Sequence, residues 1–472
     1  MRPFNLRLLF LIVALASGFA TAYTETPDRF KQVDALFAEW DKTSSPGCAL
    51  AIVQDGQVVY KRGYGMADLE HGVIISPESV FYIGSVSKQF VTMAILLLQE
   101  QGKLSVDDDI RKFLPDFPEY DRPITIRHLV HHTSGIRDYL TLWSLTGKSY
   151  LDNMDEAPVY DMIRRQKELN FSPGEQHLYS NSCYFLMSMI VQKASGQSLR
   201  EYAEQHIFEP LGMNDTHFHD DNRRLIPNRA MPYMSWEGGF GSMTMRFDLV
   251  GSGGLYSTVE DLFLWDQNFY QNKLGKGLPS LIEAMHQNGR LNSGKKIDYA
   301  FALVNGEYRG LRVVQHGGAL GGYRAQLMRF PDEKFSVIIL SNLASFNPTR
   351  LSYKTAEIFL GDKMQPAEKT VSAQSTQPDS EPKTSAPTSR NLKRLAGMYF
   401  SEELQVSYQI ELQDGKLKVK VPNMPTGELR AESNDEFSFG GVKLAFQKKG
   451  KAVSGFLLDA GRVKNLRFVK SK

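Results

Sequence analysis

The sequence predicts an α+β fold followed by a small all-β domain. Three observations support this prediction. A strand–turn–strand pattern at residues 48–60 precedes a helix, Phe81–Gly102, that is hydrophobic on every side from Val91 to Leu98 apart from one threonine. Further strand patterns follow between residues 299 and 340, and short alternating segments fill the chain beyond residue 400. These patterns indicate an antiparallel sheet covered by helices, with a barrel or sandwich after it.

The first 22 residues have the form of a signal peptide. Arg2 and Arg7 precede the apolar run Leu8–Ala16, and Ala20-Thr21-Ala22 has the small-x-small form of a cleavage site. The apolar run is shorter than the roughly 20 residues that a membrane anchor needs. No lipobox cysteine stands at the cleavage point. We therefore expect a periplasmic or secreted protein that starts near Tyr23 and has no membrane span after cleavage.

Composition excludes some classes of protein. A chain of 472 residues predicts two or three domains. A net charge of +2, without a basic run interleaved with aromatic residues, argues against nucleic-acid binding. Cys48 and Cys183 could form a disulfide or remain buried thiols, and the sequence leaves both open. No close-spaced ligand pair accompanies either cysteine, so no zinc site is predicted.

The N-terminal part begins with a helix and a hairpin. Residues Asp28–Lys42 carry apolar side chains at i, i+3, i+7 and i+10, which predicts an amphipathic helix. Cys48–Val53 and Val58–Tyr60 flank Asp55-Gly56, the signature of a β-hairpin with a type I′ turn.

The hydrophobic helix Phe81–Gly102 carries a candidate nucleophile at its start. Ser85 and Lys88 are three residues apart, so both side chains share one helical face. A lysine desolvated at the edge of a core can accept the serine proton, and the helix dipole favours the resulting anion. The same Ser-x-x-Lys spacing at Ser293–Lys296 and Ser380–Lys383 has no buried helix behind it. The buried helix that follows it makes Ser85 the candidate nucleophile among the three.

Two segments follow with polar residues at their ends. Thr125–Tyr139 is predicted as a helix that ends in a Ser-Gly turn. Its histidines 128, 131 and 132 could bind a metal by spacing, but without an acidic or cysteine partner we favour roles in capping and turns, and we predict no metal site. In Asn170–Gln192, Tyr179 and Asn181 are predicted to project from a loop before the apolar helix Tyr184–Val191.

The remainder of the first domain completes the sheet. Ser257-Thr258 is a candidate N-cap with Asp261 as its partner, and the Gly-rich run before it lacks the ending of a phosphate loop, so no cofactor is predicted. Strands are predicted at 299–304, 311–315, 325–330 and 335–340, with the glycines after His316 between the second and third. The helix Leu351–Leu360 closes the layer begun by Asp28–Lys42.

Composition changes again near residue 366. Residues 366–390 are rich in Ser, Thr, Pro and Gln and predict a linker. Alternating apolar residues from Val406 to Phe468 predict a small β-barrel or sandwich. The predicted organisation is therefore a signal peptide at 1–22, a first domain at 23–365, a linker at 366–390 and a β-domain at 391–472.

The ordered motifs Ser85-x-x-Lys88, Tyr179-x-Asn181 and His316-x-Gly318 resemble those of the serine β-lactamase and penicillin-binding-protein superfamily. The resemblance covers roughly Asp28–Gly361 and is strongest to class C β-lactamases, D-aminopeptidases, carboxypeptidases and related esterases. It implies a five-stranded antiparallel sheet flanked by helices, with an all-helical insertion between Leu104 and about Gln267. The C-terminal part resembles the lipocalin-like barrels appended to some D-aminopeptidase relatives.

The resemblance also implies residue roles. Ser85 would form an acyl-enzyme, Lys88 and Tyr179 would share the proton, and Asn181 would orient the substrate amide. Backbone N–H groups of Ser85 and Ala319 would form an oxyanion hole, which Gly318 leaves accessible. His316-Gly317 departs from the Lys-Thr that β-lactamases of this group more often carry to hold the substrate carboxylate. We therefore expect weaker action on anionic substrates than on neutral esters and amides.

These observations predict an exported serine hydrolase that acts on a small ester, amide or peptide, including cell-wall peptides. The alternatives are a slow-turnover penicillin-binding or sensing protein, a true β-lactamase, and a cell-envelope protein whose hydrolase is vestigial. No Gly-x-Ser-x-Gly elbow occurs, which argues against an α/β-hydrolase.

Overall fold

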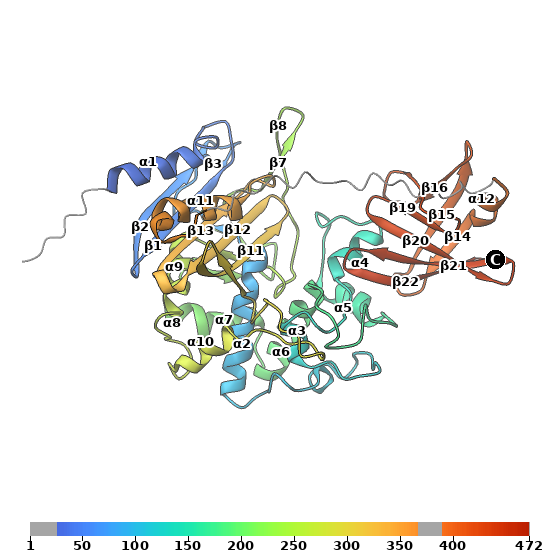
Figure 1. Ribbon diagram of the computed structural model, residues 1–472, viewed down its shortest axis with the longest axis horizontal. Helices are drawn as coiled ribbons and strands as arrows, with labels where there is room; N and C mark the ends of the chain where they lie inside the picture. The colour runs from blue at the N-terminus through green and yellow to red at the C-terminus, as the bar shows by residue number, and fades with distance from the viewer. Residues whose placement is uncertain (1–25, 367–388, 472) are drawn as a thin grey trace, which may run out of the picture.

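The computed structural model describes residues 26–366 and 389–471, which form a larger and a smaller body side by side (Figure 1). The predicted signal peptide and nearly all of the predicted linker lie outside the described residues. Within the described part of the chain, no helix combines the length and apolar character that crossing a bilayer requires.

The larger body is built on a six-stranded antiparallel sheet with the strand order β10-β11-β12-β13-β1-β2. The resemblance implied five strands, whereas this sheet has six. Each strand is hydrogen-bonded to its neighbours in this order, which makes five antiparallel pairs. The strand bounds are β1 Cys48–Gln54, β2 Gln57–Tyr64, β10 Val304–Tyr308, β11 Leu311–Leu320, β12 Tyr323–Phe330 and β13 Phe335–Ser341. The predicted hairpin is confirmed, with Asp55 and Gly56 both at positive φ as a type I′ turn requires.

Two strand predictions were wrong in position. The apolar run at 299–304 is a buried turn, with Ala302 at φ +56°, and β10 begins only at its last residue. A short apolar run is compatible with a strand or a buried turn, and periodicity alone does not separate them. Gly317 and Gly318 lie inside β11, which continues to Leu320, whereas Gly321-Gly322 form the turn between β11 and β12.

Alternating residues of the sheet face two helical layers. Leu50 and Ile52 face α1 (Thr26–Phe37) and α11 (Pro348–Leu360), whereas Ala49 and Ala51 face the opposite layer. On that opposite face α9 (Val259–Asn268) contacts β1 and β13. The small alanine side chains allow a helix to pack closely there. The layer formed by α1 and α11 is the predicted one, although α1 ends at Phe37 and not at Lys42.

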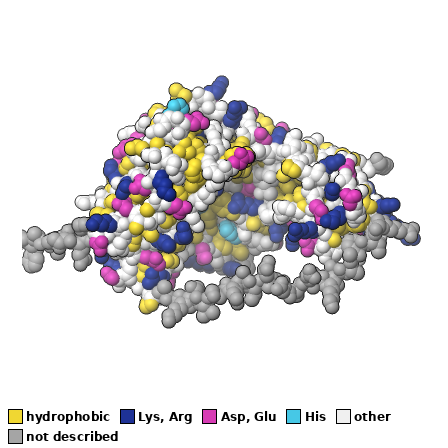
Figure 2. Space-filling model, turned by 90° about the horizontal axis from the view of Figure 1, so that it is seen from above, with side chains coloured by type: hydrophobic (Ala, Val, Ile, Leu, Met, Phe, Trp, Pro, Cys, Tyr) yellow, Lys and Arg dark blue, Asp and Glu magenta, His cyan; other side chains and the backbone are white. Residues whose placement is uncertain are grey.

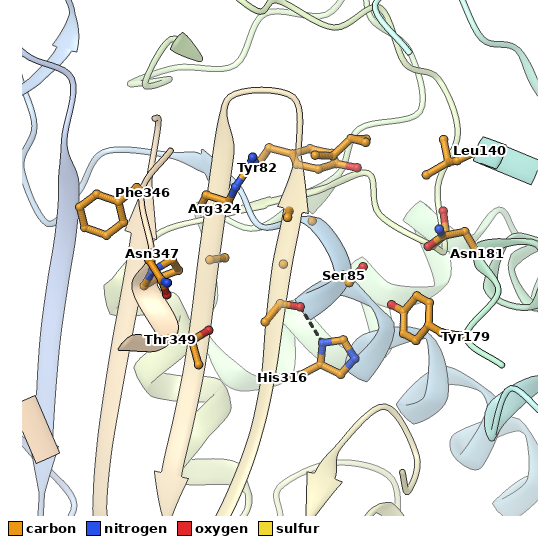
Figure 3. Close-up of a pocket in the computed structure, with 18 of the residues that line it drawn as sticks. Tyr82, Ser85, Leu140, Tyr179, Asn181, His316, Arg324, Phe346, Asn347 and Thr349 are labelled. Atoms are coloured by element: carbon orange, nitrogen blue, oxygen red, sulfur yellow. Dashed lines mark hydrogen bonds between the residues drawn. The ribbon is translucent and has the colours of Figure 1, made fainter. Parts of the chain in front are cut away.

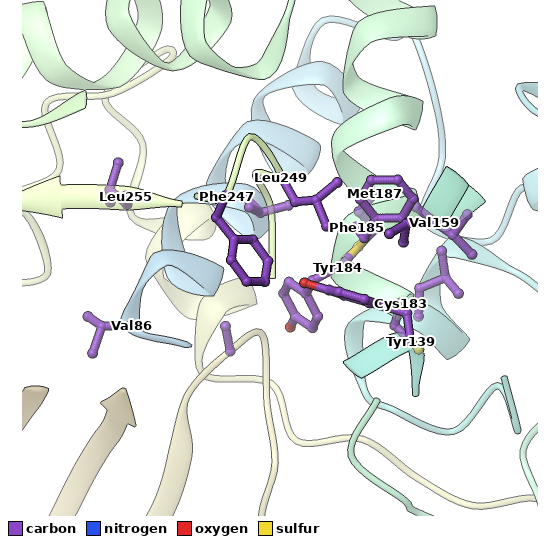
Figure 4. Close-up of a cluster of buried hydrophobic side chains, with 14 of the residues drawn as sticks. Val86, Tyr139, Val159, Cys183, Tyr184, Phe185, Met187, Phe247, Leu249 and Leu255 are labelled. Carbon is purple, nitrogen blue, oxygen red and sulfur yellow. The ribbon is translucent and has the colours of Figure 1, made fainter. Parts of the chain in front are cut away.

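The segment between the sheet strands is mainly helical. Its central member is α2 (Lys88–Glu100), whose residues are buried from Lys88 to Leu98 and which ends before Gly102 at φ +72°. The other helices are α3 Ile126–Val130, α4 Tyr139–Leu145, α5 Glu156–Arg164, α6 Asn181–Ser195, α7 Leu199–Ala203, α8 Glu209–Leu211 and α10 Pro279–Met285. Figure 4 shows part of this buried core, including Tyr184, Phe185 and Met187 of α6 and Tyr139 of α4.

The expectation of an all-helical insertion needs correction in two respects. Short strands occur within it, namely β6 His217–Phe218, β7 Tyr233–Trp236, β8 Gly239–Ser242 and β9 Leu255–Ser257, while β3 Met66–Asp68, β4 Val73–Ile74 and β5 Phe81–Tyr82 precede it. The helix predicted over Thr125–Tyr139 is only the five residues of α3, because the chain turns at His132, whose φ is +54°. The predicted N-cap is confirmed, since the Thr258 hydroxyl accepts a hydrogen bond from the Asp261 N–H.

The smaller body is a nearly closed nine-stranded antiparallel barrel. After α12 (Ser389–Leu395), its strands are β14 Gly397–Ser401, β15 Val406–Gln413, β16 Lys416–Lys420, β17 Gly427–Glu428, β18 Arg430–Ala431, β19 Glu436–Phe439, β20 Val442–Lys449, β21 Ala452–Ala460 and β22 Val463–Lys470. The two edge strands, β17 and β18, are separated only by the buried Leu429, which brings the edges together. The alternating pattern predicted this architecture.

Candidate active site

Ser85 and Lys88 meet where a 3₁₀ turn joins α2. Ser85 lies in the turn η1 (Gly84–Ser87), and Lys88 is the first residue of α2. In a 3₁₀ turn side chains three residues apart eclipse one another, which brings the two polar atoms together. Gly84 has φ +55°, and a Cβ on it would lie 2.7 Å from the Ala319 nitrogen. Glycine is therefore required for the turn to approach β11.

Lys88 is fully buried among oxygen acceptors. Its Nζ lies 2.9 Å from Ser85 Oγ, 3.0 Å from Asn181 Oδ1 and 2.5 Å from the Ser252 carbonyl oxygen. Burial holds the pKa of Lys88 well below its usual value, against the opposing charge of Asp138. A neutral amine has two N–H groups and one lone pair. The two carbonyl-type oxygens accept the N–H groups, which leaves the lone pair for the Ser85 hydroxyl.

Tyr179 lies in the loop before α6, with its hydroxyl facing Ser85 (Figure 3). That hydroxyl is buried and has no hydrogen-bond partner among the described residues. Burial raises the pKa of Tyr179, so the phenol keeps its proton near neutral pH. An unpartnered O–H beside a nucleophile can donate to a reacting atom.

Asn181 is held by Asp138, which was not among the predicted site residues. Asn181 is the first residue of α6, and not part of the preceding loop as predicted. Its backbone N–H and its Nδ2 donate to Asp138 Oδ2 over 2.7 and 2.8 Å. Asp138 also caps α4 by accepting from the Thr141 N–H. An aspartate directly before an apolar run is an N-cap signal, so this residue was available to sequence reasoning.

His316 belongs to a polar chain behind Tyr179. The Ser180 N–H donates to His132 Nδ1, and His132 Nε2 lies 3.3 Å from the Tyr299 hydroxyl. That hydroxyl lies 3.1 Å from His316 Nε2, and His316 Nδ1 lies 2.7 Å from the Gly317 carbonyl oxygen. If His132 carries its proton on Nε2 and His316 carries its proton on Nδ1, all four hydrogen bonds form with both rings neutral. Burial lowers the pKa of His132 far below its usual value and that of His316 to about 4.

His316 is consequently neutral at pH 7, and both of its nitrogens are used inside the protein. The His132 ring lies 4.1 Å from the Tyr179 ring, so this chain of contacts also supports Tyr179 from behind. Sequence reasoning missed Tyr299 because it placed that residue in a strand.

Gly318 and Ala319 lie on β11 beside the serine. A Cβ on Gly318 would lie 2.0 Å from the Ile83 carbonyl oxygen and 3.0 Å from the Ser85 nitrogen. The backbones of β11 and η1 are thus in direct contact. The close approach brings the backbone segments of Ser85 and Ala319 together, which is compatible with the predicted oxyanion hole.

These residues line a cavity of about 560 Å³ that opens between the two bodies and is visible as the hollow in Figure 2. Ser85, Tyr179, Asn181, His316, Gly318 and Ala319 all line it, as Figure 3 shows for the labelled side chains. The lining also contains two arginines, Arg324 of β12 and Arg462 of the barrel. The sequence assigned neither of them to the site, because the first stands on a strand beyond the motif and the second lies in the other domain.

The other candidate groups take structural roles. His128 Nδ1 accepts from the Thr125 N–H in a capping box, and His131 contacts the Arg127 and Gln287 carbonyl oxygens. These contacts agree with the predicted structural roles of His128 and His131, whereas His132 belongs to the polar chain behind Tyr179. Cys48 and Cys183 are both buried and free, and burial raises the pKa of the Cys183 thiol to about 11. Neither thiol is activated as a nucleophile.

Comparisons with known proteins agree with this geometry. The sequence profile of the family described as Beta-lactamase matches residues 33–360. The chain is 32% identical over 330 residues to penicillin-binding protein 4* of Bacillus subtilis, covering 66% of this chain and 71% of that protein. It is 27% identical over 383 residues to a D-aminopeptidase of Gluconobacter oxydans, covering 80% and 68% of the two chains.

Solved structures show the same fold. The octameric penicillin-binding protein homologue from Pyrococcus abyssi superposes with a TM-score of 0.64 at 23% identity, over 93% of this chain and 100% of that one. The D-amino acid amidase from Ochrobactrum anthropi gives a TM-score of 0.61 at 21% identity, over 71% and 99% of the two chains. With its family profile, its relatives and its fold in agreement, the chain belongs to the beta-lactamase family and is a hydrolytic enzyme of the serine hydrolase superfamily.

Proposed function

We propose that this protein is an exported serine hydrolase that cleaves a peptide-like amide or ester through an acyl-enzyme on Ser85. The observation that carries the proposal is the environment of Lys88. Its buried amine lies 2.9 Å from Ser85 Oγ, and its two N–H groups are taken by Asn181 and the Ser252 carbonyl oxygen. The lone pair is therefore directed at the Ser85 hydroxyl, which lines the cavity.

The reaction follows from this arrangement. Lys88 accepts the Ser85 proton as Oγ bonds to the substrate carbonyl carbon, and the oxyanion is held by the N–H groups of Ser85 and Ala319. The C–N or C–O bond then breaks, and Tyr179 donates its proton to the leaving atom while it regains one from the Lys88 ammonium. Water reverses these proton movements in the second half of the cycle and releases the acid.

The substrate class rests on the site and on the relatives together. The relatives named D-aminopeptidase and the solved D-amino acid amidase act on amides, and others are named penicillin-binding proteins. We propose an amide or ester of peptide character, with cell-wall peptides included. A slow-turnover penicillin-binding or sensing protein, or a true β-lactamase, remains the alternative function because the same acyl-enzyme would serve each of them.

Export is part of the proposal and rests on the leader pattern alone. Arg2, Arg7, the run Leu8–Ala16 and the Ala20-Thr21-Ala22 site support delivery to the periplasm or outside the cell. N-terminal sequencing of the protein from its native host tests it. A mature end near Tyr23 is expected, and a retained Met1 would contradict export.

Stopped-flow kinetics with p-nitrophenyl esters, D-amino-acid p-nitroanilides and nitrocefin test the reaction. We expect a stoichiometric burst followed by steady turnover of esters or amides, with both phases lost in Ser85→Ala. Ser293→Ala is the matched control, since Ser293 has the same spacing to a lysine but lies exposed in a turn. A burst without turnover would favour the sensing alternative, and turnover confined to nitrocefin would favour a β-lactamase. Full activity of Ser85→Ala would overturn the proposal.

A further inference from the structure

The active-site cavity includes a residue from the C-terminal barrel. Strands β21 and β22 form a hairpin whose turn, Gly461-Arg462, reaches the larger body next to α4 (Figure 1). Arg462 lines the same cavity as Ser85 and Tyr179. The barrel therefore contributes a side chain to a site whose other lining residues all come from the larger body.

Hydrogen bonds to the larger body hold the turn in place at Arg462 and at Lys464. The Asn170 side chain donates to the Arg462 carbonyl oxygen over 2.9 Å and accepts from the Lys464 N–H over 2.8 Å. The guanidinium of Arg137, which is fully buried, donates to the Lys464 carbonyl oxygen and pairs with Glu403 of the barrel at 2.9 Å. These contacts fix the position of the Arg462 backbone relative to the catalytic residues.

The Arg462 guanidinium is held beside Tyr179 and Asp138 without using its hydrogen-bond donors on any described residue. Its Cζ lies 4.8 Å from the centre of the Tyr179 ring, and its Nη1 lies 3.8 Å from Asp138 Oδ2. The second distance is too long for a hydrogen bond, and that oxygen already accepts two from Asn181. The side chain is 44% exposed, and within the described residues its guanidinium makes no hydrogen bond. Its donors are free to face the cavity.

The charge of the cavity points to an anionic ligand. Arg462 and Arg324 are permanent cations, His316 is neutral, and none of the described residues that line the cavity is an aspartate or glutamate. Arg324 already donates to the Gly321 and Tyr323 carbonyl oxygens in the β11–β12 turn, so Arg462 has the larger share of free donors. A planar guanidinium with free donors matches the geometry of a carboxylate.

We propose that Arg462 binds a carboxylate on the substrate and that the barrel is thereby part of the specificity site. The inference rests on the proposed acyl-enzyme function and extends it to a substrate class. It also replaces the expectation drawn from His316-Gly317: the cation missing from that strand is supplied by the other domain. Substrates that present an ammonium group at this position would be repelled by the same charge.

Two pairs of esters test the proposal. In one pair the leaving phenol carries a meta carboxylate or a meta carboxamide on an N-acetylglycine ester. In the other the acyl chain of a p-nitrophenyl ester is glutarate or its monoamide. For at least one pair we expect kcat/KM of the wild-type enzyme to favour the carboxylate by about tenfold or more, the range of a charge-assisted hydrogen bond.

Variants of Arg462 distinguish an effect of its charge from an effect of its packing on the carboxylate-to-carboxamide ratio. Arg462→Met should bring this ratio close to one, and Arg462→Lys should retain most of the preference. Arg467→Met is the matched control, because Arg467 stands on β22, the strand that follows the Arg462 turn, lies 3.8 Å from Glu168 across the same junction and does not line the cavity. It should leave the ratio unchanged. Comparing ratios within one variant cancels any general loss of folded protein.

Labelling of Ser85 by a fluorophosphonate, followed in every variant, keeps the two proposals apart. Equal carboxylate-to-carboxamide ratios in wild type and Arg462→Met, with Ser85 still labelled, would overturn the role of Arg462 and leave the hydrolase function standing. A wild-type protein that is not acylated at Ser85 by any probe would overturn the proposed function itself.

Discussion

The two bodies bury different kinds of side chain. Around the cavity of the larger body, Lys88, His132 and His316 are buried polar groups held by specific partners, and burial lowers the pKa of each. The barrel interior is instead filled by aromatic rings, with Tyr399 and Phe456 at 5.0 Å and Phe456 and Phe468 at 4.7 Å. The chemistry therefore lies in the larger body. Under the proposals above, the barrel acts through its outer surface, at the turn that carries Arg462.

A lysine over a tyrosine ring occurs in both bodies and provides the largest expected contrast. Lys88 lies 4.9 Å from the Tyr179 ring centre and Lys470 lies 5.6 Å from that of Tyr399. Lys88→Arg keeps a long side chain with N–H donors but replaces the amine that accepts the Ser85 proton by a group that does not deprotonate in proteins. We expect kcat to fall by about 10²–10⁴-fold, the usual contribution of a general base.

The matched change in the barrel, Lys470→Met, should leave kcat unchanged and alter the free energy of unfolding by only about 0.5–1 kcal/mol. Steady-state kinetics and denaturant unfolding measure the two quantities. If Lys88→Arg retained wild-type kcat, Lys88 would not be the base.

The next largest effect, a loss of stability, is expected at the junction between the two bodies. Arg137 and Glu403 form an ion pair whose side chains are 0% and 6% exposed. Replacing one partner leaves a buried charge without its counterpart, so Arg137→Met and Glu403→Gln should each lower the free energy of unfolding by about 3–5 kcal/mol. The double variant should lose clearly less than the sum. Additive losses in urea unfolding would show that the pair does not couple the bodies.

The pH dependence of stability should differ between the bodies. All ten histidines lie before residue 320, and none is in the barrel. Burial lowers the pKa of His316 and of His131 to about 4, below the unfolded value of about 6.5. The unfolded chain therefore binds more protons between pH 6.5 and 4. The stability that the neutral rings provide is complete above pH 6.5 and is lost as the pH falls through this window.

For His316 that loss amounts to about 3 kcal/mol over the window. Hydrogen exchange of backbone amides at pH 7 and pH 5 should show weaker protection of α2 and α6 at the lower pH, with a smaller change in β21 and β22. His316→Gln should reduce the dependence in the larger body. An equal loss of amide protection in both bodies would contradict the assignment of the pH dependence to the buried histidines.

Local patterns predicted most of the fold and the reacting groups. The hairpin at Asp55-Gly56, the helix that follows Lys88 and the alternating barrel strands all depend on short-range periodicity, and the structure has them. Ser85, Lys88, Tyr179, Asn181, His316, Gly318 and Ala319 are brought to one cavity or its wall. Their roles stay predictions.

The groups that the sequence did not reveal act over long separations. Tyr299 joins His132 to His316, and Arg462 reaches Tyr179 from a domain that begins beyond the linker. Neither contact leaves a periodic signal, because each depends on how separate elements pack. Asp138 is intermediate: its capping position is visible locally, but its bonds to Asn181 are not.

The central claim is that Ser85 carries the acyl group, and mass spectrometry of the enzyme quenched during turnover of a slow ester tests it most directly. We predict an added acyl mass on the peptide that contains Ser85, formed at the burst rate and absent from Ser85→Ala. An adduct on Ser293 or on any other peptide, or turnover by wild type with no adduct on the Ser85 peptide under conditions that trap the intermediate, would contradict the account.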